Sequence, residues 1–285
     1  MNILVTGASG PAGRSLLTQL HRRGLSVLGV DVAPQPRTDG LPVTAVSAAS
    51  DPEYVAELHR LVQHHEIDLL LPTVQEELPI LARHRLAQTL VADPEPIDIA
   101  GDKWTTHQVL QAAGIAVPRT ALGSRLTPAA AEWIGAPFVT KPRVSRGGRG
   151  VVVHQASTPH PDKMLLDETL IVSEFVPGQE YCPNVFVADD PSDDIAVVLR
   201  KTGLAGGNIG NATGVEISTE AHLGDLALAA CRAIGLRGPC DVDVRLRADG
   251  TPVVLEINAR FGANSAAAPA LLDAALATLT TGASR

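Results

Sequence analysis

The fold is decided by two neighbouring stretches of the chain, Asp241-Val242-Asp243-Val244-Arg245 and Val253-Val254-Leu255-Glu256-Ile257-Asn258-Ala259-Arg260. A turn with the sequence Ala248-Asp249-Gly250 separates the two stretches, which predicts an antiparallel hairpin. Successive side chains of a strand point to opposite faces, so every second residue shares a face. The acidic, amide and arginine side chains follow this spacing and are expected to lie together.

The polar side of this hairpin has the composition of a metal and phosphate site. Asp243, Glu256 and Asn258 offer hard oxygen ligands, which suit Mg²⁺ (or Mn²⁺) bound together with phosphates. Arg260 follows in the same alternation and can bind a phosphoryl group during transfer. A salt-bridged surface hairpin is the alternative. Carboxylates on an apolar strand are costly unless they are paired or bind metal, so we favour the metal site.

A second motif, residues 141–150, is a glycine-rich loop between two expected strands. Its distinctive members are Lys141, Ser145, Gly147, Gly148 and Gly150. The loop joins two strands and does not open a helix, so it is not a P-loop. Backbone N–H groups of such a loop can surround phosphates, and the lysine can reach one of them. A solvated basic hairpin is the alternative.

A third motif lies where an expected strand ends, turns at Pro177-Gly178 and starts again. An adenine needs one backbone acceptor and one backbone donor, and a ribose needs a carboxylate. The segment can supply both needs through Glu174, Val176 and Glu180. Taken alone, however, it is an ordinary hairpin.

Residues 1–95 alternate apolar strands with helical patterns, which predicts a parallel, doubly wound sheet. The first turn contains Gly7, Gly10 and Gly13, and Asp31 ends the next strand. This spacing resembles a dinucleotide fingerprint and alone would suggest an NAD(P)-dependent short-chain reductase or epimerase. Such enzymes also carry Tyr-x-x-x-Lys, and neither tyrosine of this chain has lysine at that place. We therefore expect the turn to pack strand against helix.

The composition is that of a folded protein with a modest negative charge. The 285 residues are 45% hydrophobic and 19% charged, with a net charge of −8. No block of Lys and Arg occurs, so a nucleic-acid partner is not expected. No apolar run is long enough to span a bilayer, and the three cysteines lack Cys-x-x-Cys spacing. We expect a cytoplasmic protein with reduced thiols and no membrane partner.

Together and in this order, the motifs resemble the ATP-grasp superfamily, most closely its members similar to carbamoyl phosphate synthetase and pyrrolysine ligase. The resemblance covers nearly the whole chain. It implies a pre-ATP-grasp α/β domain at 1–95, a small subdomain with the glycine-rich lid at 96–172, and a C-terminal subdomain with the Mg/ATP site at 173–285. The implied fold class is a parallel-sheet α/β lobe followed by an α+β ATP-grasp fold of two subdomains.

The resemblance also implies roles for individual residues. ATP-binding contacts are implied for Lys103, Lys141, Ser145, Gly147, Gly148, Gly150, Glu174, Val176 and Glu180. Metal ligation is implied for Asp243, Glu256 and Asn258, and catalytic contacts for Arg260 and Lys201. The loop at 206–211 could close, with Lys201, over a reactive acyl phosphate.

The reaction that the resemblance implies is the ATP-dependent ligation of a small-molecule carboxylate to an amine. The carboxylate attacks the γ-phosphate of MgATP, and the amine then displaces phosphate from the acyl phosphate. The short segment after Arg260 favours a stand-alone ligase, such as an amino acid ligase, over a carboxylase. Relatives are often dimers, so the chain could also form a homodimer. The alternatives are an NAD(P)-dependent reductase or epimerase and a nucleotide-binding protein without catalysis.

Overall fold

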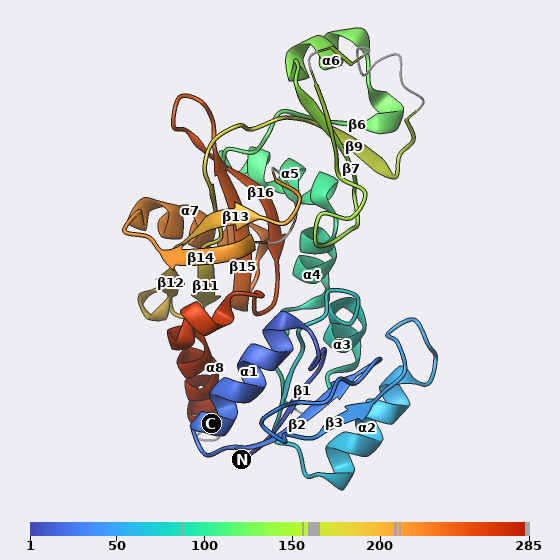
Figure 1. Ribbon diagram of the computed structural model, residues 1–285, viewed down its shortest axis with the longest axis vertical. Helices are drawn as coiled ribbons and strands as arrows, with labels where there is room; N and C mark the ends of the chain where they lie inside the picture. The colour runs from blue at the N-terminus through green and yellow to red at the C-terminus, as the bar shows by residue number, and fades with distance from the viewer. Residues whose placement is uncertain (87, 156, 159–165, 208–209, 211, 283–285) are drawn as a thin grey trace.

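The computed structural model describes residues 1–86, 88–155, 157–158, 166–207, 210 and 212–282. These residues form three lobes, which Figure 1 shows with the N-terminal lobe in blue, a small subdomain in green and a large subdomain in orange and red. Each lobe contains one β-sheet. The parallel sheet of the first lobe and the antiparallel sheets of the other two confirm the expected fold class.

The N-terminal lobe is a parallel sheet of five strands in the order β3-β2-β1-β4-β5. Its central strands are almost entirely apolar and buried, as expected of a parallel sheet that helices cover. Its elements are β1 (Asn2–Val5), α1 (Pro11–Arg22), β2 (Ser26–Asp31), β3 (Val43–Ala45), α2 (Tyr54–His64), β4 (Leu69–Leu71), α3 (Leu78–His84) and β5 (Gln88–Thr89).

The small subdomain is an antiparallel sheet of four strands in the order β6-β9-β7-β8. Its core is a small cluster around Phe138 and Val172. Its elements are β6 (Thr120–Leu122), α6 (Pro128–Ile134), β7 (Phe138–Pro142), β8 (Val152–His154) and β9 (Leu170–Glu174). The glycine-rich loop joins β7 to β8, as the sequence predicted.

The large subdomain is an antiparallel sheet in which β15 pairs with β16, and α7 covers one face. The segments at 180–187 and 195–204 are each divided into two strands, because the chain crosses between neighbouring pairings near Pro183 and Val198. Its elements are β10 (Glu180–Tyr181), β11 (Asn184–Val187), β12 (Ile195–Val197), β13 (Leu199–Leu204), β14 (Ala212–Ile217), α7 (Ala221–Ile234), β15 (Gly238–Leu246), β16 (Pro252–Asn258) and α8 (Pro269–Gly282).

Three helices join the lobes to one another. The helices α4 (Pro94–Gly101) and α5 (Lys103–Ala112) precede the small subdomain in the chain, but their buried side chains join the core of the large subdomain. The last helix, α8, lies beside α1, where Leu271 and Leu272 share a core with Leu16 and Leu17 (Figure 1). The N-terminal lobe and the large subdomain therefore share a continuous hydrophobic core. In the described part of the chain, no helix has both the length and the apolar character of a membrane span.

The N-terminal glycine turn packs tightly against its own helix. A Cβ atom at Gly13 would lie 2.2 Å from the carbonyl oxygen of Gly7, so only glycine fits there. Gly7 itself has a φ of +58°, which favours glycine. The Asp31 carboxylate accepts hydrogen bonds from the backbone N–H of Ser9 (2.9 Å) and of Ala33 (3.0 Å). These contacts account for the glycines and the aspartate by packing and turn formation.

Glu77 is a buried carboxyl of the N-terminal lobe and gives it a pH-dependent stability. It is 5% exposed, and the hydroxyl of Thr6 donates a hydrogen bond to it. Burial raises the pKa of Glu77 to about 7, from 4.5. The folded state therefore binds more protons than the unfolded chain between these pH values. The free energy of unfolding falls as the pH rises from about 4.5 through 7, and the loss is complete above that range.

The variant Glu77→Gln stays neutral at every pH and should escape this loss. At pH 8 we expect it to exceed the wild type in free energy of unfolding by roughly 2 kcal/mol, and at pH 5 to match it. Urea unfolding at both pH values measures the difference. Glu76→Gln is the matched control, because the Glu76 side chain is 52% exposed and should change stability little at either pH. A Glu77→Gln variant that is less stable than the wild type at pH 8 would contradict this account.

Candidate active site

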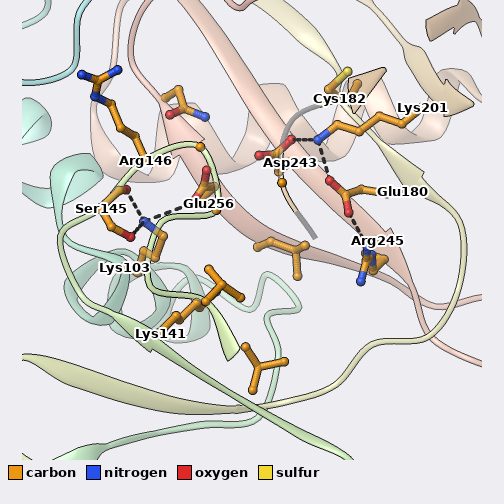
Figure 2. Close-up of a pocket in the computed structure, with 18 of the residues that line it drawn as sticks. Lys103, Lys141, Ser145, Arg146, Glu180, Cys182, Lys201, Asp243, Arg245 and Glu256 are labelled. Carbon is orange, nitrogen blue, oxygen red and sulfur yellow. Dashed lines mark hydrogen bonds and ion pairs between the residues drawn. The ribbon is translucent and has the colours of Figure 1, made fainter. Parts of the chain in front are cut away.

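A pocket between the sheet of the small subdomain and the β15-β16 hairpin brings together the residues that the sequence singled out (Figure 2). The predicted residues that line it are Lys103, Lys141, Ser145, Gly147, Gly148, Glu174, Val176, Glu180, Lys201, Asp243, Glu256, Asn258 and Arg260. Gly150 is outside the lining. Its φ is +72°, and a Cβ atom there would lie 2.8 Å from Pro142, so it shapes the base of the loop.

The β15-β16 hairpin forms the acidic wall of the pocket. Asp243 lies opposite Glu256, and Asp241 lies opposite Asn258. The register shifts after Asp243, which marks a bulge beside the acidic pair. The Asn258 side-chain amide donates to the carbonyl oxygen of Asp241 (3.3 Å), which fixes its orientation.

Lys103, the first residue of α5, reaches this wall from the side. Its ammonium donates to the carbonyl oxygen of Ser145 (2.6 Å) and lies 3.1 Å from a carboxylate oxygen of Glu256 (Figure 2). Asp102 caps the helix by accepting from the N–H of Trp104 (3.0 Å), and it also pairs with Arg143 of the loop. The start of α5 is therefore tied to the glycine-rich loop.

Lys201 of β13 pairs with two carboxylates on the opposite side of the pocket. Its ammonium lies 2.5 Å from Glu180 and 2.6 Å from Asp243 (Figure 2). Burial alone would lower the pKa of Lys201, but Asp243 and Glu180 outweigh it and raise the pKa above its usual range. Arg245 holds the other oxygen of Glu180 at 2.5 Å. Lys201 is therefore charged and placed between the predicted ribose acid and a predicted metal ligand.

Lys141 is the third lysine of the pocket, and it comes from β7 of the small subdomain. It is 9% exposed and lines the same pocket. Burial lowers the pKa of Lys141 to about 8, although nearby Glu256 favours its charged form. The pocket thus collects cations from two subdomains around one acidic wall.

The donor set of the wall fits a hard divalent cation. Burial raises the pKa of Asp243, and the neighbouring carboxylates of Glu256 and Asp241 raise it further. A cation shared by Asp243 and Glu256 would relieve this crowding, and the Asn258 amide oxygen adds a neutral ligand. Among the described residues, no group of three His, Cys, Asp or Glu side chains is arranged for a metal. Two carboxylates and an amide agree instead with Mg²⁺, which takes its other ligands from phosphate and water.

The hinge between the subdomains carries the predicted adenine contacts. The Glu174 carboxylate pairs with Arg247 at 2.7 Å and with Arg119. Its side chain therefore stabilises the hinge through ion pairs. Burial raises the pKa of Glu174, but these two guanidinium groups outweigh it and lower the pKa overall. Val176 is 3% exposed, and its carbonyl oxygen accepts from Arg245 (3.3 Å). The backbone of the segment lines the pocket, where a purine edge could meet it.

A buried histidine links this hinge to the acidic wall. The Nε2 of His107 lies 3.0 Å from the carbonyl oxygen of Leu255, which only accepts, so Nε2 carries the proton. Nδ1 lies 3.1 Å from the hydroxyl of Thr120, which donates to the carbonyl oxygen of Pro118 (2.9 Å) and lies 2.9 Å from the hydroxyl of Ser173. Burial lowers the pKa of His107 to about 3, so the ring is neutral. These polar contacts connect α5, β6 and β9 to the strand that carries Glu256.

The glycine-rich loop covers the pocket. Gly147 and Gly148 have φ values of +61° and +74°, and a Cβ atom at Gly148 would lie 2.9 Å from the backbone of Gly210. The tips of two loops therefore meet over the site. The cavity measures about 170 Å³ and is partly open to solvent. Asn208, Ile209 and Asn211 of the second loop lie outside the described residues.

Sequence reasoning missed several members of the pocket. Asp241, Arg245 and Cys182 line it, and the first two are each 8% exposed. The alternation that selected Asp243 also places Asp241 and Arg245 on its face, so that signal was available. Burial raises the pKa of Cys182 well above its usual range, so its thiol is not a nucleophile at neutral pH.

The fold and the site geometry agree with what is known of other proteins. One protein family, described as an ATP-grasp domain, matches residues 100–264. The chain belongs to the ATP-grasp family. The match spans every predicted contact residue, from Lys103 to Arg260, and includes α5, the glycine-rich loop and the acidic hairpin. Membership confirms the superfamily expected from the motifs and does not favour the NAD(P)-dependent alternative.

ATP-grasp ligases are found among its relatives. A D-alanine--D-alanine ligase from Cupriavidus taiwanensis is 27% identical over 268 residues, which cover 88% of this chain and 77% of that protein. A D-alanine--D-alanine ligase from Xanthobacter autotrophicus is 30% identical over 182 residues, which cover 58% of this chain and 59% of that protein.

Solved ATP-grasp structures share the fold. An L-amino acid ligase from Bacillus licheniformis superposes with a TM-score of 0.68 at 19% identity, covering 93% of this chain and 68% of that one. The biotin carboxylase of Campylobacter jejuni superposes with a TM-score of 0.69 at 19% identity. The superposition covers 93% of this chain and 66% of that one. At this identity the likeness concerns the fold alone.

Proposed function

We propose that this ATP-grasp protein is an ATP-dependent ligase that activates a small-molecule carboxylate as an acyl phosphate and couples it to an amine. The observation that carries the proposal is the convergence of Lys103, Lys141 and Lys201 on one acidic wall within a single pocket. Such a pocket can neutralise the charge of a triphosphate on one side and hold its cation on the other.

Each side chain has a role in this proposal. Lys103 and Lys141 bind phosphate oxygens, and the glycine-rich loop excludes water from them. Asp243, Glu256 and Asn258 would hold Mg²⁺ or Mn²⁺, which supplies charge neutralisation at the phosphates. Glu180 binds the ribose, while the backbone at Glu174 and Val176 contacts the adenine. Arg260 stabilises the phosphoryl group as it moves to the substrate carboxylate, and Lys201 holds the acyl phosphate.

A second cavity next to the first is suited to the substrate. It measures about 680 Å³ and lies between the N-terminal lobe and the loop. Arg260 lines both cavities, so a carboxylate bound in the second would face the phosphoryl group held in the first. The N-terminal lobe contributes Asp31, Glu76 and Glu77 to the lining, and the loop contributes Arg149 and Arg146, which pairs with Glu76 at 2.6 Å. Carboxylates and guanidinium groups in one cavity favour a substrate that carries both an ammonium and a carboxylate, such as an amino acid.

The first test compares ligands by thermal unfolding. MgATP at about a hundred times its dissociation constant should stabilise the protein by roughly 2.7 kcal/mol, whereas NADP(H) should have no effect. ADP release is then screened against a panel of amino acids paired with amines. A shift with NADP(H) alone would overturn the proposal and make the N-terminal turn a cofactor site.

The finer parts of the proposal have their own tests. Limited proteolysis tests the three units at residues 1–95, 96–172 and 173–285. Light scattering tests a homodimer, and cell fractionation tests a cytoplasmic location.

A further inference from the structure

Asp241 is a buried carboxylate in the ATP pocket to which the proposed reaction gives no role. It lies on β15, two residues before Asp243, and it is 8% exposed. Burying an ionised carboxylate beside a phosphate site has two free-energy costs. The carboxylate loses its hydration, and it repels the negatively charged phosphates. A role that needs its charge would account for its position.

The two carboxylate oxygens of Asp241 have different partners. Oδ1 accepts from the side-chain amide of Asn184 on β11 (3.2 Å), which fixes the carboxylate in the sheet. Oδ2 accepts from Nη1 of Arg260 (3.4 Å), whose same nitrogen donates to the carbonyl oxygen of Phe261 (3.1 Å). The guanidinium is therefore held through one terminal nitrogen, and its other N–H groups can face the pocket.

Gly262 provides the space for this pair. A Cβ atom at position 262 would lie 2.6 Å from Cγ and 2.7 Å from Oδ2 of Asp241. Gly262 is not among the residues with positive φ, so its backbone would accept alanine. The glycine is therefore required by the Asp241 carboxylate and not by the turn.

We propose that Asp241 is a positioning residue that fixes Arg260 in the orientation that receives the transferring phosphoryl group, with Asn184 and Gly262 as its supports. The inference rests on the proposed function, because it assigns Arg260 to that group. Asp241 itself touches Arg260 and not the reacting atoms.

The test separates binding of the diphosphate from recognition of the phosphoryl group. Calorimetry with MgADP, and with MgADP plus aluminium fluoride as the phosphoryl mimic, gives the two affinities for the wild type and for Asp241→Asn. We expect the MgADP affinity of the variant to stay within about twofold, and the fluoride complex to weaken roughly tenfold or more. Arg260→Lys should show the same pattern, and the double variant should lose little more than either single one.

Asp194→Asn is the matched control for a general structural loss. Asp194 pairs with Arg232 at 2.6 Å, its side chain is 10% exposed, and it lies outside the lining of the pocket. This variant should lower the thermal midpoint and leave both affinities unchanged. Asp241→Asn would be a structural defect, and the inference wrong, if both of its affinities fell together with its thermal midpoint.

Gly262→Ala tests the same contact independently. The added methyl group should displace the Asp241 carboxylate and weaken the fluoride complex, whereas in an Asp241→Ala background it should have no further effect. Additive losses would overturn the inference. If Arg260→Lys weakens the fluoride complex and Asp241→Asn does not, Asp241 has no positioning role and the proposed function stands. A wild type that binds no MgADP would overturn both.

Discussion

The variant Glu256→Gln is expected to lower ADP release by roughly a thousandfold while the protein stays folded. Glu256 faces Asp243 across the hairpin and carries one of the two charges proposed to hold the divalent cation. Glutamine keeps the size and one acceptor oxygen, so Lys103 retains a partner there as well as the carbonyl oxygen of Ser145. The thermal midpoint should therefore move by only a few degrees.

Two measurements make this expectation specific to the metal. ADP binding with and without Mg²⁺ should differ strongly in the wild type and hardly at all in Glu256→Gln. Glu216→Gln is the control, because Glu216 forms an ordinary surface pair with Arg200 and its side chain is 52% exposed. Unchanged ADP release by Glu256→Gln would remove this residue from the proposed metal set.

The second large effect is expected from Lys141→Met, which should weaken ATP binding by about a hundredfold. The variant removes the cation that the small subdomain contributes to the pocket and keeps a side chain of similar length. Burial disfavours the charged form of Lys141 and lowers its pKa to about 8. Methionine does not carry that cost, so the free energy of unfolding should stay the same or rise.

Opposite movements of affinity and stability distinguish this result from a damaged fold. Calorimetry gives the ATP affinity, and urea unfolding gives the stability. Arg83→Met serves as the control, because Arg83 of α3 is half exposed and forms a surface pair with Asp98 of α4, outside the lining of the pocket. ATP affinity that survives in Lys141→Met would assign the phosphates to Lys103 and Lys201 alone.

The elements that the sequence predicted well are those with a local signal. The β15-β16 hairpin has two-residue alternation and an Asp-Gly turn, and the glycine-rich loop lies between two strands as its sequence predicted. The helices α4 and α6 were not predicted. Both begin with proline, which reads as a loop signal but is well tolerated in the first turn of a helix.

The arrangement of the site could be predicted only in part. Period-two spacing correctly placed Asp243, Glu256 and Asn258 on one wall, although their role as metal ligands remains a prediction. The ion pairs that organise the pocket join residues far apart in the chain, such as Lys103 with Glu256, and no local pattern encodes them. No local pattern encodes the contact between Oδ2 of Asp241 and Arg260 either, because it depends on how the chain turns after β16.

The unequal hydrophobic cores set which part of the molecule can open alone. The N-terminal lobe and the large subdomain are joined through α1 and α8, whereas the small subdomain has its own small cluster around Phe138 and Val172. Amide hydrogens of β7 and β9 should therefore exchange through local opening, at lower free energy than those of β1 or β15. ATP would be held from both sides of this boundary, by Lys141 on one and Lys103 on the other. Nucleotide binding would then raise the protection of the weaker part most.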